Sequence, residues 1–460
     1  MPTLSMLERL QRDLVRHGLF PLQERLKHHT TLADLRTLNA SQWWPAGQLA
    51  AYRQAALTEL LTEIAAHVPY YRELFARLGL DPADLRVDSL SDLPLLDKAT
   101  IRANAEGLRS PRHPDMQRSN TGGSTGAPLI FWLTRERVSH DVAAKLRSFE
   151  WWDVTFGDRE LVVWGAPHEL GRQDRIRNLR DRLFRSALMP AFNMGDVQLQ
   201  AYCETIRRKR PRILFGYPSA ITLIAEHAAR HQIDLSQIGV SVVFVTAEQL
   251  YPHQRNAITE AFGCPVANGY GARDAGFIAH ECPHGNLHIT AEDIIVEIVD
   301  ESGVPVAPGE TGEIVTTHLR NRGYPLIRYR TGDLGHLDPN PCPCGRTLPV
   351  LGAVEGRSTD FLLAADGRRV HALGLIYVLR DRKEVREFQI HQPTTDRIEV
   401  RIDCGPDSAR LAPRLGAEIT AQFQKILGNI AVDIEWLSPL PRPKSGKFRY
   451  VTSDPGQAHA

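Results

Sequence analysis

The spacing of hydrophobic and polar residues divides the chain into regions of different kinds. Up to about residue 110, apolar positions such as Leu57, Leu60, Leu61 and Ile64 recur at helical spacing, which predicts helices with one buried face. From residue 161 to about 271, short apolar runs alternate with amphipathic stretches, which predicts parallel strands with helices on the faces of a sheet. These runs are residues 161–164, 213–215 and 242–245.

The pattern changes after residue 271. Two runs, residues 294–299 and 312–317, flank a turn rich in Gly and Pro, which predicts an antiparallel β subdomain. Residues 356–360 are predicted to be a hinge, because a second, smaller α/β pattern follows them. We therefore expect an α/β fold, with a large domain over residues 1–357 that begins with helices. A small, mobile α+β domain follows over residues 358–460, with the last ten residues frayed.

Composition narrows the class of protein. The chain has 460 residues, of which 42% are hydrophobic and 24% charged, as in ordinary globular proteins. The formal net charge of +1 creates no overall field that would recruit nucleic acid. We find no apolar stretch of signal-peptide length and none near the roughly 20 residues that span a bilayer. We expect a cytoplasmic protein with no nucleic-acid partner and no membrane insertion.

Residues 121–126 read Thr-Gly-Gly-Ser-Thr-Gly, a turn rich in glycines and hydroxyls. Glycine lets successive N–H groups converge on an anion, and the hydroxyls add donors, so the run suits a phosphate. No Lys-Ser or Lys-Thr follows the last glycine, and the GxGxxG spacing is absent, so the run is neither a Walker loop nor a dinucleotide fingerprint. Taken alone, such a run is more often an ordinary surface loop than a phosphate site.

Further motifs follow this loop in order. They are Asn-Gly-Tyr-Gly at 268–271, Tyr-Arg-Thr-Gly-Asp at 329–333, Gly-Arg-Ser-Thr-Asp at 356–360 and Pro-Arg-Pro-Lys-Ser-Gly-Lys at 441–447. Together with the loop they resemble the acyl-adenylate-forming enzymes. His-Val-Pro-Tyr-Tyr-Arg at 67–72 and Asp-Leu-Pro-Leu-Leu-Asp-Lys at 92–98 resemble the phenylacetate-CoA ligase family more closely. The form of the loop, with residues 366–371 and 445–450, resembles the branch found with capsule and exopolysaccharide clusters.

The resemblance implies an AMP-forming ligase. Such an enzyme activates a carboxylic acid with ATP, releases pyrophosphate, and passes the acyl group from the acyl-adenylate to the thiol of coenzyme A. The acid is already ionised at neutral pH, so the protein must position two anions and neutralise charge rather than supply a general base. One alternative is transfer to an amine, which gives an amide. A third interpretation, a nucleotide-binding scaffold without turnover, is disfavoured because the motif residues are all present.

Resemblance assigns the nucleotide contacts. Thr121, Gly122, Gly123, Ser124, Thr125 and Gly126 would hold the β and γ phosphates of ATP. Asp333 resembles the carboxylate that binds both ribose hydroxyls, and Arg357 the arginine near ribose and phosphate. Lys447 resembles the catalytic lysine that bridges the carboxylate and the α-phosphate when the small domain closes. Without the resemblance, Asp333 is a turn residue, Arg357 a surface arginine and Lys447 part of a solvated basic tail.

The adenine and acid sites are expected at strand ends. Ala247 and Glu248 correspond to the family's adenine-side turn, with Asn268, Tyr270 and Gly271 as the opposite wall. Trp164, Tyr217 and Tyr270 are candidates for an acyl pocket, which favours an aromatic or apolar acid. Their other interpretation is simple core packing.

The chain departs from the family at the Mg²⁺ ligand. Adenylate-forming enzymes usually have Glu three residues after the glycine of the 268–271 motif, whereas this chain has Asp274. A shorter carboxylate can still reach the metal through water.

Six cysteines are unevenly placed. Cys203, Cys264 and Cys404 are scattered and are expected to be buried small hydrophobes. Cys342 and Cys344 lie in a Pro/Gly turn, and a second Cys-Pro turn holds Cys282. Together with one histidine they would complete a tetrahedral zinc site, as in some relatives. His288 matches the family better and His284 has the tighter local spacing; free surface thiols are the alternative.

Two basic stretches and the oligomeric state complete the expectations. Residues 172–185 carry arginines interleaved with apolar residues, which predicts a solvated amphipathic helix. The cluster at 207–212 suits the phosphates of coenzyme A or of an anionic carrier. Relatives are commonly dimers, so a homodimer is possible.

Overall fold

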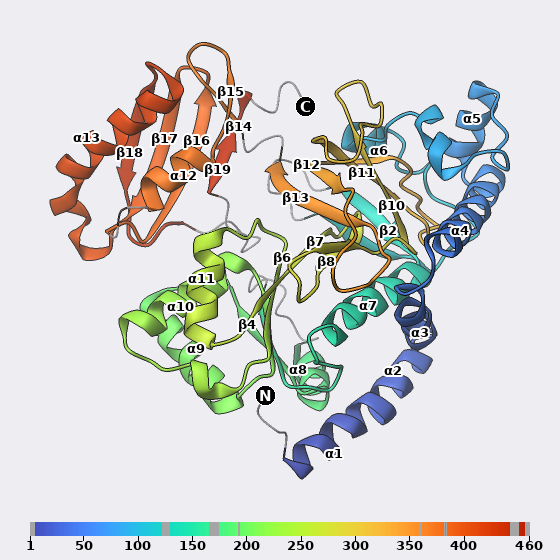
Figure 1. Cartoon of the computed structure of the whole chain (residues 1–460), viewed down its shortest axis with the longest axis horizontal. Helices are drawn as coiled ribbons and strands as arrows, with labels where there is room; N and C mark the ends of the chain where they lie inside the picture. Colours follow the sequence, from blue (N-terminus) through green and yellow to red (C-terminus); the bar gives the residue numbers. More distant parts are fainter. Residues whose placement is uncertain are drawn as a thin grey trace. The chain divides into compact units, whose positions relative to one another are not determined.

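The computed structural model describes residues 5–121, 129–164, 174–191, 194–357, 361–380, 382, 384–441 and 450–455 (Figure 1). It divides the chain into two compact units. One holds Met1–Thr331 with Gly335–Val354, and the other holds Gly332–Leu334 with Glu355–Ala460. In the described residues, no helix combines the length and the apolar character that crossing a membrane requires.

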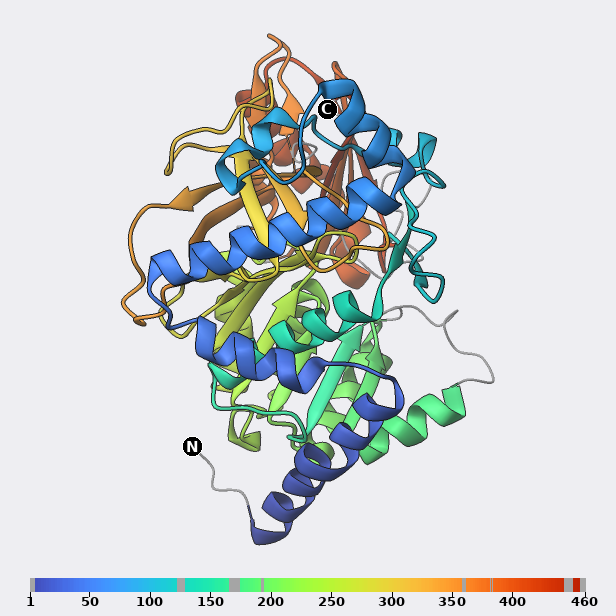
Figure 2. The same cartoon turned by 90° about the vertical axis from the view of Figure 1, so that its right-hand side faces the viewer.

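Helices dominate the first hundred residues, as predicted. They are α1 (Met6–Leu14), a π-helical turn (Val15–Leu19), α2 (Phe20–Leu26), α3 (Thr31–Ser41), α4 (Ala46–His67), α5 (Pro69–Leu78), a 3₁₀ turn (Val87–Asp92) and α6 (Lys98–Ala103). The longest of them, α4, crosses the first unit in Figure 2. Its Leu57, Leu60, Leu61 and Ile64 are fully buried, which confirms the face that the spacing predicts.

An antiparallel hairpin and a helix follow. The hairpin pairs β1 (Gln117–Asn120) with β2 (Ile130–Leu133), and α7 (Arg135–Glu150) begins two residues later. The Thr134 side chain accepts a hydrogen bond from the Arg137 N–H and so caps α7.

One large sheet forms the centre of the first unit. Its 11 strands run in the order β10-β11-β12-β13-β9-β8-β7-β6-β5-β3-β4. They are β3 (Glu160–Trp164), β4 (Ser186–Pro190), β5 (Ile213–Gly216), β6 (Val242–Thr246), β7 (Val266–Ala272), β8 (Gly276–Glu281), β9 (Leu287–Ile289), β10 (Ile294–Val299), β11 (Gly312–His318), β12 (Tyr329–Asp338) and β13 (Val350–Arg357). Strands β4, β3, β5, β6 and β7 are parallel.

Helices cover both faces of the parallel part. The linking helices are α8 (Asp174–Leu183), α9 (Asp196–Lys209), α10 (Pro218–Arg230) and α11 (Pro252–Phe262). Leu214 and Val243 join one buried cluster with residues of α9, α10 and α11. Their neighbours along the strands, Phe215 and Phe244, pack with Phe149 of α7 on the other face. These strands therefore carry apolar residues at successive positions, because both of their faces are buried.

The predicted antiparallel region is present, and it belongs to the same sheet. Strand β10 pairs with β11 in antiparallel register from Ile294↔His318 to Val299↔Glu313. The change of direction comes at the β7–β8 hairpin, where the chain packs closely: a Cβ on Gly271 would lie 2.4 Å from the Gly276 carbonyl oxygen. Only glycine allows this approach. The antiparallel strands therefore extend the parallel sheet rather than form a separate layer.

The second unit contains a hairpin and a small sheet. Its elements are β14 (Phe361–Leu363), β15 (Arg369–His371), α12 (Leu373–Arg380), β16 (Glu387–Thr394), β17 (Arg397–Asp403), α13 (Ser408–Leu427), β18 (Ala431–Trp436) and β19 (Val451–Ser453). The four-stranded sheet has the order β18-β17-β16-β19. The expectation that the last ten residues are all frayed is wrong, because Val451–Ser453 pair in parallel with β16. A three-residue strand is too short to show an alternation in the sequence.

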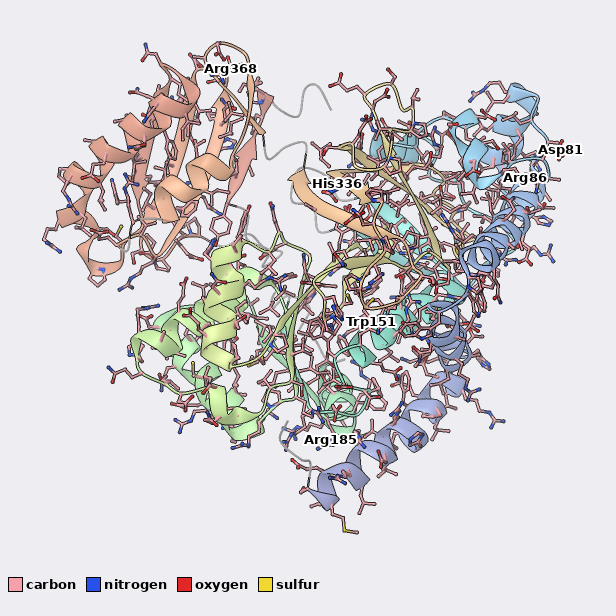
Figure 3. All side chains as sticks on the ribbon, in the orientation of Figure 1. Asp81, Arg86, Trp151, Arg185, His336 and Arg368 are labelled. Atoms are coloured by element: carbon pink, nitrogen blue, oxygen red, sulfur yellow. The ribbon has the colours of Figure 1, made fainter. Side chains whose placement is uncertain are left out.

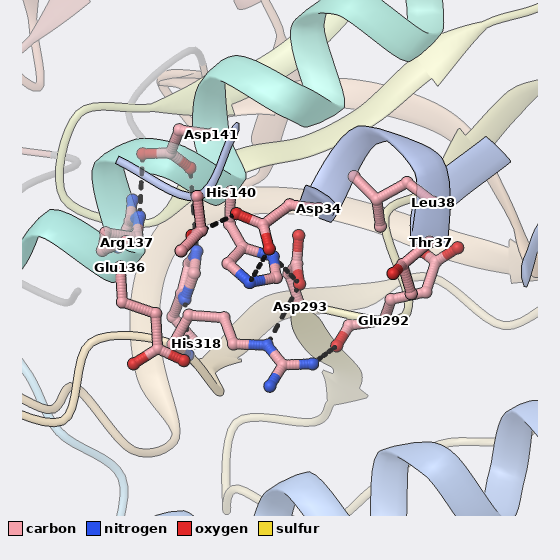
Figure 4. A network of polar contacts seen from close by, with 12 residues as sticks. Asp34, Thr37, Leu38, Glu136, Arg137, His140, Asp141, Glu292, Asp293 and His318 are labelled. Carbon is pink, nitrogen blue, oxygen red and sulfur yellow. Dashed lines mark hydrogen bonds and ion pairs between the residues drawn. The ribbon is translucent and has the colours of Figure 1, made fainter. Parts of the chain in front are cut away.

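A network of buried charges holds α7 in place (Figure 4). His140 Nδ1 lies 2.8 Å from Asp293 Oδ1, and Asp293 also accepts from Arg320 Nε at 3.3 Å. Further ion pairs join His140 to Asp34 of α3, at 3.4 Å, and Arg147 to Glu292, at 2.6 Å. The network ties the helix that follows the hairpin to α3 and to the turn before β10.

Candidate functional site

The predicted adenine and acid residues gather at one edge of the sheet. Strands β3, β5, β6 and β7 are parallel, so their carboxyl ends meet there, which is where ligands bind in open α/β sheets. The register places Gly216 beside Val245 and Thr246 beside Gly269. Trp164, Tyr217, Ala247 and Asn268 therefore belong to neighbouring strand ends.

Aromatic rings stack at the ends of β3 and β5. The rings of Trp164 and Tyr217 are 4.2 Å apart with an interplanar angle of 24°, and Trp164 also stacks on Phe215 at 5.7 Å. The strands approach closely here, since a Cβ on Gly216 would lie 2.3 Å from the Val163 carbonyl oxygen. Tyr217 is buried and Trp164 is partly exposed, so the stack forms an apolar wall with one accessible ring.

The turn after β6 has a strained backbone. Ala247 has a φ of 70°, a left-handed conformation that non-glycine residues rarely adopt. Next to it, Glu248 Oε2 accepts the Ser219 N–H at 3.2 Å, in the first turn of α10. Such strain costs about 1–3 kcal/mol and is typical of ligand-binding turns. The turn is thus fixed to the helix that follows the aromatic wall.

The 268–271 motif contacts the 329–333 motif. The Asn268 N–H donates to Glu281 Oε2 at 2.7 Å, and Tyr270 Oη donates to Thr331 Oγ1 at 3.4 Å. Thr331 in turn donates to the Ile314 carbonyl at 2.7 Å. The structure therefore brings together two motifs that are some sixty residues apart in the sequence.

Asp274 is held by a tyrosine. The hydroxyl of Tyr329 donates to Asp274 Oδ2 at 2.5 Å, and the carboxylate is buried. Direct Mg²⁺ binding would compete with this bond at that oxygen. A magnesium role for Asp274 stays a prediction, and the position of Tyr329 is a feature that the sequence did not indicate.

Several predicted residues lie outside the described residues. These are Gly122, Gly123, Ser124, Thr125, Gly126, Lys447 and the side chain of Arg357. Thr121 is described: its Oγ1 accepts the Leu129 N–H at 2.9 Å and closes the base of the hairpin. Asp333 lies in β12, in the part of that strand assigned to the second unit. The nucleotide roles of these residues stay predictions.

Residues of the basic cluster at 207–212 end a helix or form hydrogen bonds within the fold. Arg207, Arg208 and Lys209 form the last turn of α9, where cations are favourable next to the free carbonyls. Arg212 donates to the Asp153 carbonyl at 3.1 Å and to Ser241 Oγ at 2.9 Å. Binding of a phosphate by this cluster stays a prediction.

The four predicted zinc ligands come together. Ligand atoms of Cys282, His288, Cys342 and Cys344 all lie within 4.8 Å of one another. Cys282 Sγ is 3.7 Å from Cys342 Sγ, and Cys344 Sγ is 3.2 Å from His288 Nε2. Ligands placed tetrahedrally about zinc at about 2.3 Å would be roughly 3.7 Å apart. The alternative ligand His284 is exposed and is not part of the cluster.

Burial keeps the histidine of the cluster neutral, as metal binding requires, but it disfavours the thiolate form of the cysteines. Burial lowers the pKa of His288 to about 4, so its imidazole is neutral at pH 7. Its Nδ1 lies 3.2 Å from the Leu348 carbonyl, which fixes the tautomer with Nε2 toward the cysteines. Burial raises the pKa of Cys282 to about 11. Burial also opposes ionisation of Cys342, but hydrogen bonds from Asn286 and from the Cys344 N–H lower its pKa.

The side chains that surround the cysteine cluster were not predicted from the sequence. Asn286 Nδ2 donates to Cys342 Sγ at 3.1 Å, and it lies within the Cys-Pro-His-Gly-Asn-Leu-His run that contains two of the ligands. The Trp151 ring packs edge-on against His288 at 5.7 Å, and the Arg346 guanidinium lies over Trp151 at 4.6 Å. Figure 3 labels Trp151, which comes from the end of α7. No pattern in the sequence indicates that the end of α7 packs against the turns that hold the cysteines.

Known proteins give the class of this fold. Residues 121–319 match the family described as AMP-binding enzyme. A crystal structure of 2-hydroxyisobutyryl-CoA ligase in the postadenylation state, in complex with R3-HIB-AMP, superposes with a TM-score of 0.72 at 19% identity, over 90% of this chain and 91% of that chain. The chain therefore has the fold of the adenylate-forming ligases, which confirms the predicted fold class.

Curated relatives match most of the chain. A phenylacetate-coenzyme A ligase of Thermus thermophilus is 25% identical over 88% of this chain and 97% of its own length. Protein CapK of Staphylococcus aureus is 23% identical over 86% of this chain and 87% of its own length. The resemblance seen in the motifs is confirmed: the chain is related to the phenylacetate-CoA ligases and to CapK over most of its length.

Proposed function

We propose that the protein activates a carboxylic acid with ATP, releasing pyrophosphate, and then transfers the acyl group from the acyl-adenylate to coenzyme A. The observation that carries this proposal is the carboxyl edge of β3, β5, β6 and β7, where an aromatic wall, a strained turn and the 268–271 motif lie on adjacent strand ends. The relatives named as CoA ligases favour the thiol over the amine as acceptor.

In the proposed reaction, some groups would position the substrates and others would neutralise the phosphate charge. The acid would lie against Trp164 and Tyr217, and the adenine between the Ala247 turn and the 268–271 motif. The glycine-rich loop would hold the phosphates, and Mg²⁺, bound chiefly by phosphate oxygens and water, would neutralise them. Lys447 would bridge the acid and the α-phosphate, so that the carboxylate oxygen attacks phosphorus and pyrophosphate leaves.

A pyrophosphate-exchange assay tests this function. With a panel of aromatic and aliphatic acids, we expect at least one acid to drive exchange of labelled pyrophosphate into ATP. Adding coenzyme A should then give an acyl-CoA, identified by mass, with AMP in equal amount. If ATP binds and no acid drives exchange, the proposed reaction is wrong. If a product forms only with an amine, the acceptor is wrong.

We also propose that Cys282, His288, Cys342 and Cys344 hold a structural zinc ion. Their spacing, the neutral histidine and the carbonyl behind it all fit a closed tetrahedral site. Four protein ligands leave no open position, so the ion would stabilise the β8–β9 region and would not take part in the reaction.

A further inference from the structure

Helix α1 points its apolar face away from the protein. Met6, Leu7, Leu10 and Leu14 have exposed fractions of 80%, 64%, 58% and 62%. At about 100° per residue, these four lie within an arc of about 100° on one side of the helix. A surface helix normally buries such a stripe against the core. In α1 the apolar stripe is exposed to solvent instead.

The polar side of α1 is what binds it to the body. Glu8 forms an ion pair with Arg159 at 2.7 Å, and its carbonyl accepts from Arg185 Nη1 at 3.1 Å (Arg185 is labelled in Figure 3). The helix also packs tightly on a loop, since a Cβ on Gly157 would lie 2.7 Å from the Arg12 carbonyl oxygen. The outward stripe therefore belongs to a helix that contacts the body through Glu8 and Arg12.

Other apolar side chains, on α2 and α8, are exposed as well. They are Leu22 and Leu26 of α2, and Leu179 and Leu183 of α8. The two segments meet at Phe156, whose ring packs on Phe20 at 4.0 Å and on Phe184 at 5.6 Å. We call Met6, Leu7, Leu10, Leu14, Leu22 and Leu26 the N-terminal apolar surface. Gathered apolar exposure of this kind marks a binding surface.

Positive charges outnumber negative charges beside this surface. Basic side chains of the segment are exposed, whereas Glu24 is buried and hydrogen-bonded to Thr31, and Asp13 pairs with Arg12 at 3.1 Å. A pocket at the end of α2 brings Arg135 close to these cations, although Arg135 itself pairs with Asp115 at 3.5 Å. The exposed arginines and lysines of the segment, which supply these cations, are Arg9, Arg25 and Lys27.

We propose that the N-terminal apolar surface docks on an anionic lipid bilayer, with α1 and α2 lying in the plane of the interface. The leucines would enter the boundary between headgroups and acyl chains, and the cations would contact lipid phosphates. The segment Met6–Leu26 is about 31 Å long at 1.5 Å per residue, long enough to lie flat on the membrane. A second copy fits less well, because a two-fold contact would bring the same cations together.

Vesicle sedimentation tests this docking. We expect the full chain to sediment with vesicles of phosphatidylglycerol and phosphatidylcholine in equal parts, and to stay in solution with phosphatidylcholine alone. Leu10→Gln/Leu14→Gln should weaken binding about tenfold or more. Arg25→Gln/Lys27→Gln should weaken it about tenfold, and an increase in ionic strength should act in the same direction.

The matched control is Val197→Gln, which replaces an exposed apolar residue on another helix, α9, and should bind vesicles like the wild type. Thermal midpoints and pyrophosphate exchange should be unchanged in all variants, so the docking is judged apart from the proposed reaction. Failure to bind mixed vesicles overturns the proposal. So does a wild-type dimer that Leu10→Gln/Leu14→Gln dissociates in sedimentation without any vesicle binding, since the occupant would then be a second copy.

Discussion

His140 and Asp293 form a buried ion pair whose stability depends on pH. Burial opposes the charge on each residue, yet Asp293 raises the pKa of His140, and His140 with Arg320 lowers the pKa of Asp293. Because the pKa of His140 is raised on folding, its protonated form stabilises the folded protein fully at pH values below the ordinary histidine pKa of about 6.5. This stability is lost as the pH rises through the pKa of folded His140. Because the pKa of Asp293 is lowered on folding, its ionised form stabilises the folded protein fully at pH values above the ordinary aspartate pKa of about 3.9. This stability is lost as the pH falls through the pKa of folded Asp293.

Removing one member of this pair should destabilise the first unit. We expect Asp293→Asn to cost about 3–5 kcal/mol, because it removes the buried carboxylate that His140 and Arg320 share and leaves Asp34 as the carboxylate that pairs with His140. The loss should be largest between about pH 4 and pH 6.5 and smaller at alkaline pH, measured as urea unfolding of each protein across pH. Asp115→Asn, in an exposed pair with Arg135, should cost less than about 1 kcal/mol. An equal loss at every pH would contradict this account.

A second prediction at the scale of single residues concerns Lys447. We expect Lys447→Ala to abolish pyrophosphate exchange while ATP binding, measured by calorimetry, is largely kept, because the lysine is assigned to the reacting groups rather than to the adenine. Lys444→Ala, in the same basic stretch of the sequence, is the matched control and should retain exchange. Comparable exchange in the two variants would refute the role of Lys447.

At the scale of elements, the cysteine cluster joins two turns of the large sheet. One turn links β8 to β9, and the other lies between β12 and β13. We expect about one zinc per chain by elemental analysis. Cys342→Ser/Cys344→Ser should lose the metal and lower the thermal midpoint by several degrees, because binding energy contributes directly to folding.

Cys404→Ser is the control for the zinc prediction, since it changes a buried thiol outside the cluster. It should keep the zinc. Exchange activity per folded molecule should be similar in all these variants at low temperature, as expected for an ion without an open coordination position. A purified protein with no zinc and the same midpoint after chelation would contradict the proposal.

The whole molecule shows what the sequence can predict. Runs such as 213–215 and 242–245 indicated buried parallel strands, so the residues that follow them could be assigned to one edge. Two Cys-Pro turns indicated the cysteines that the structure brings together. The left-handed backbone of Ala247 and its neighbour's bond to Ser219 were not predictable, because they depend on how α10 packs. Helical spacing in α1 was visible too, but periodicity defines a face and not the direction in which it points.

The position of β19 near the end of the chain affects where a tag or a truncation can be placed. Strands β18 and β19 lie at opposite edges of the small sheet, three strand spacings or about 14 Å apart, and the stretch between them in sequence contains Lys447. The segment that holds the proposed catalytic lysine therefore has a strand of the small sheet on each side of it in the sequence. A purification tag placed after the last residue leaves β19 in place, whereas a truncation at residue 450 removes it.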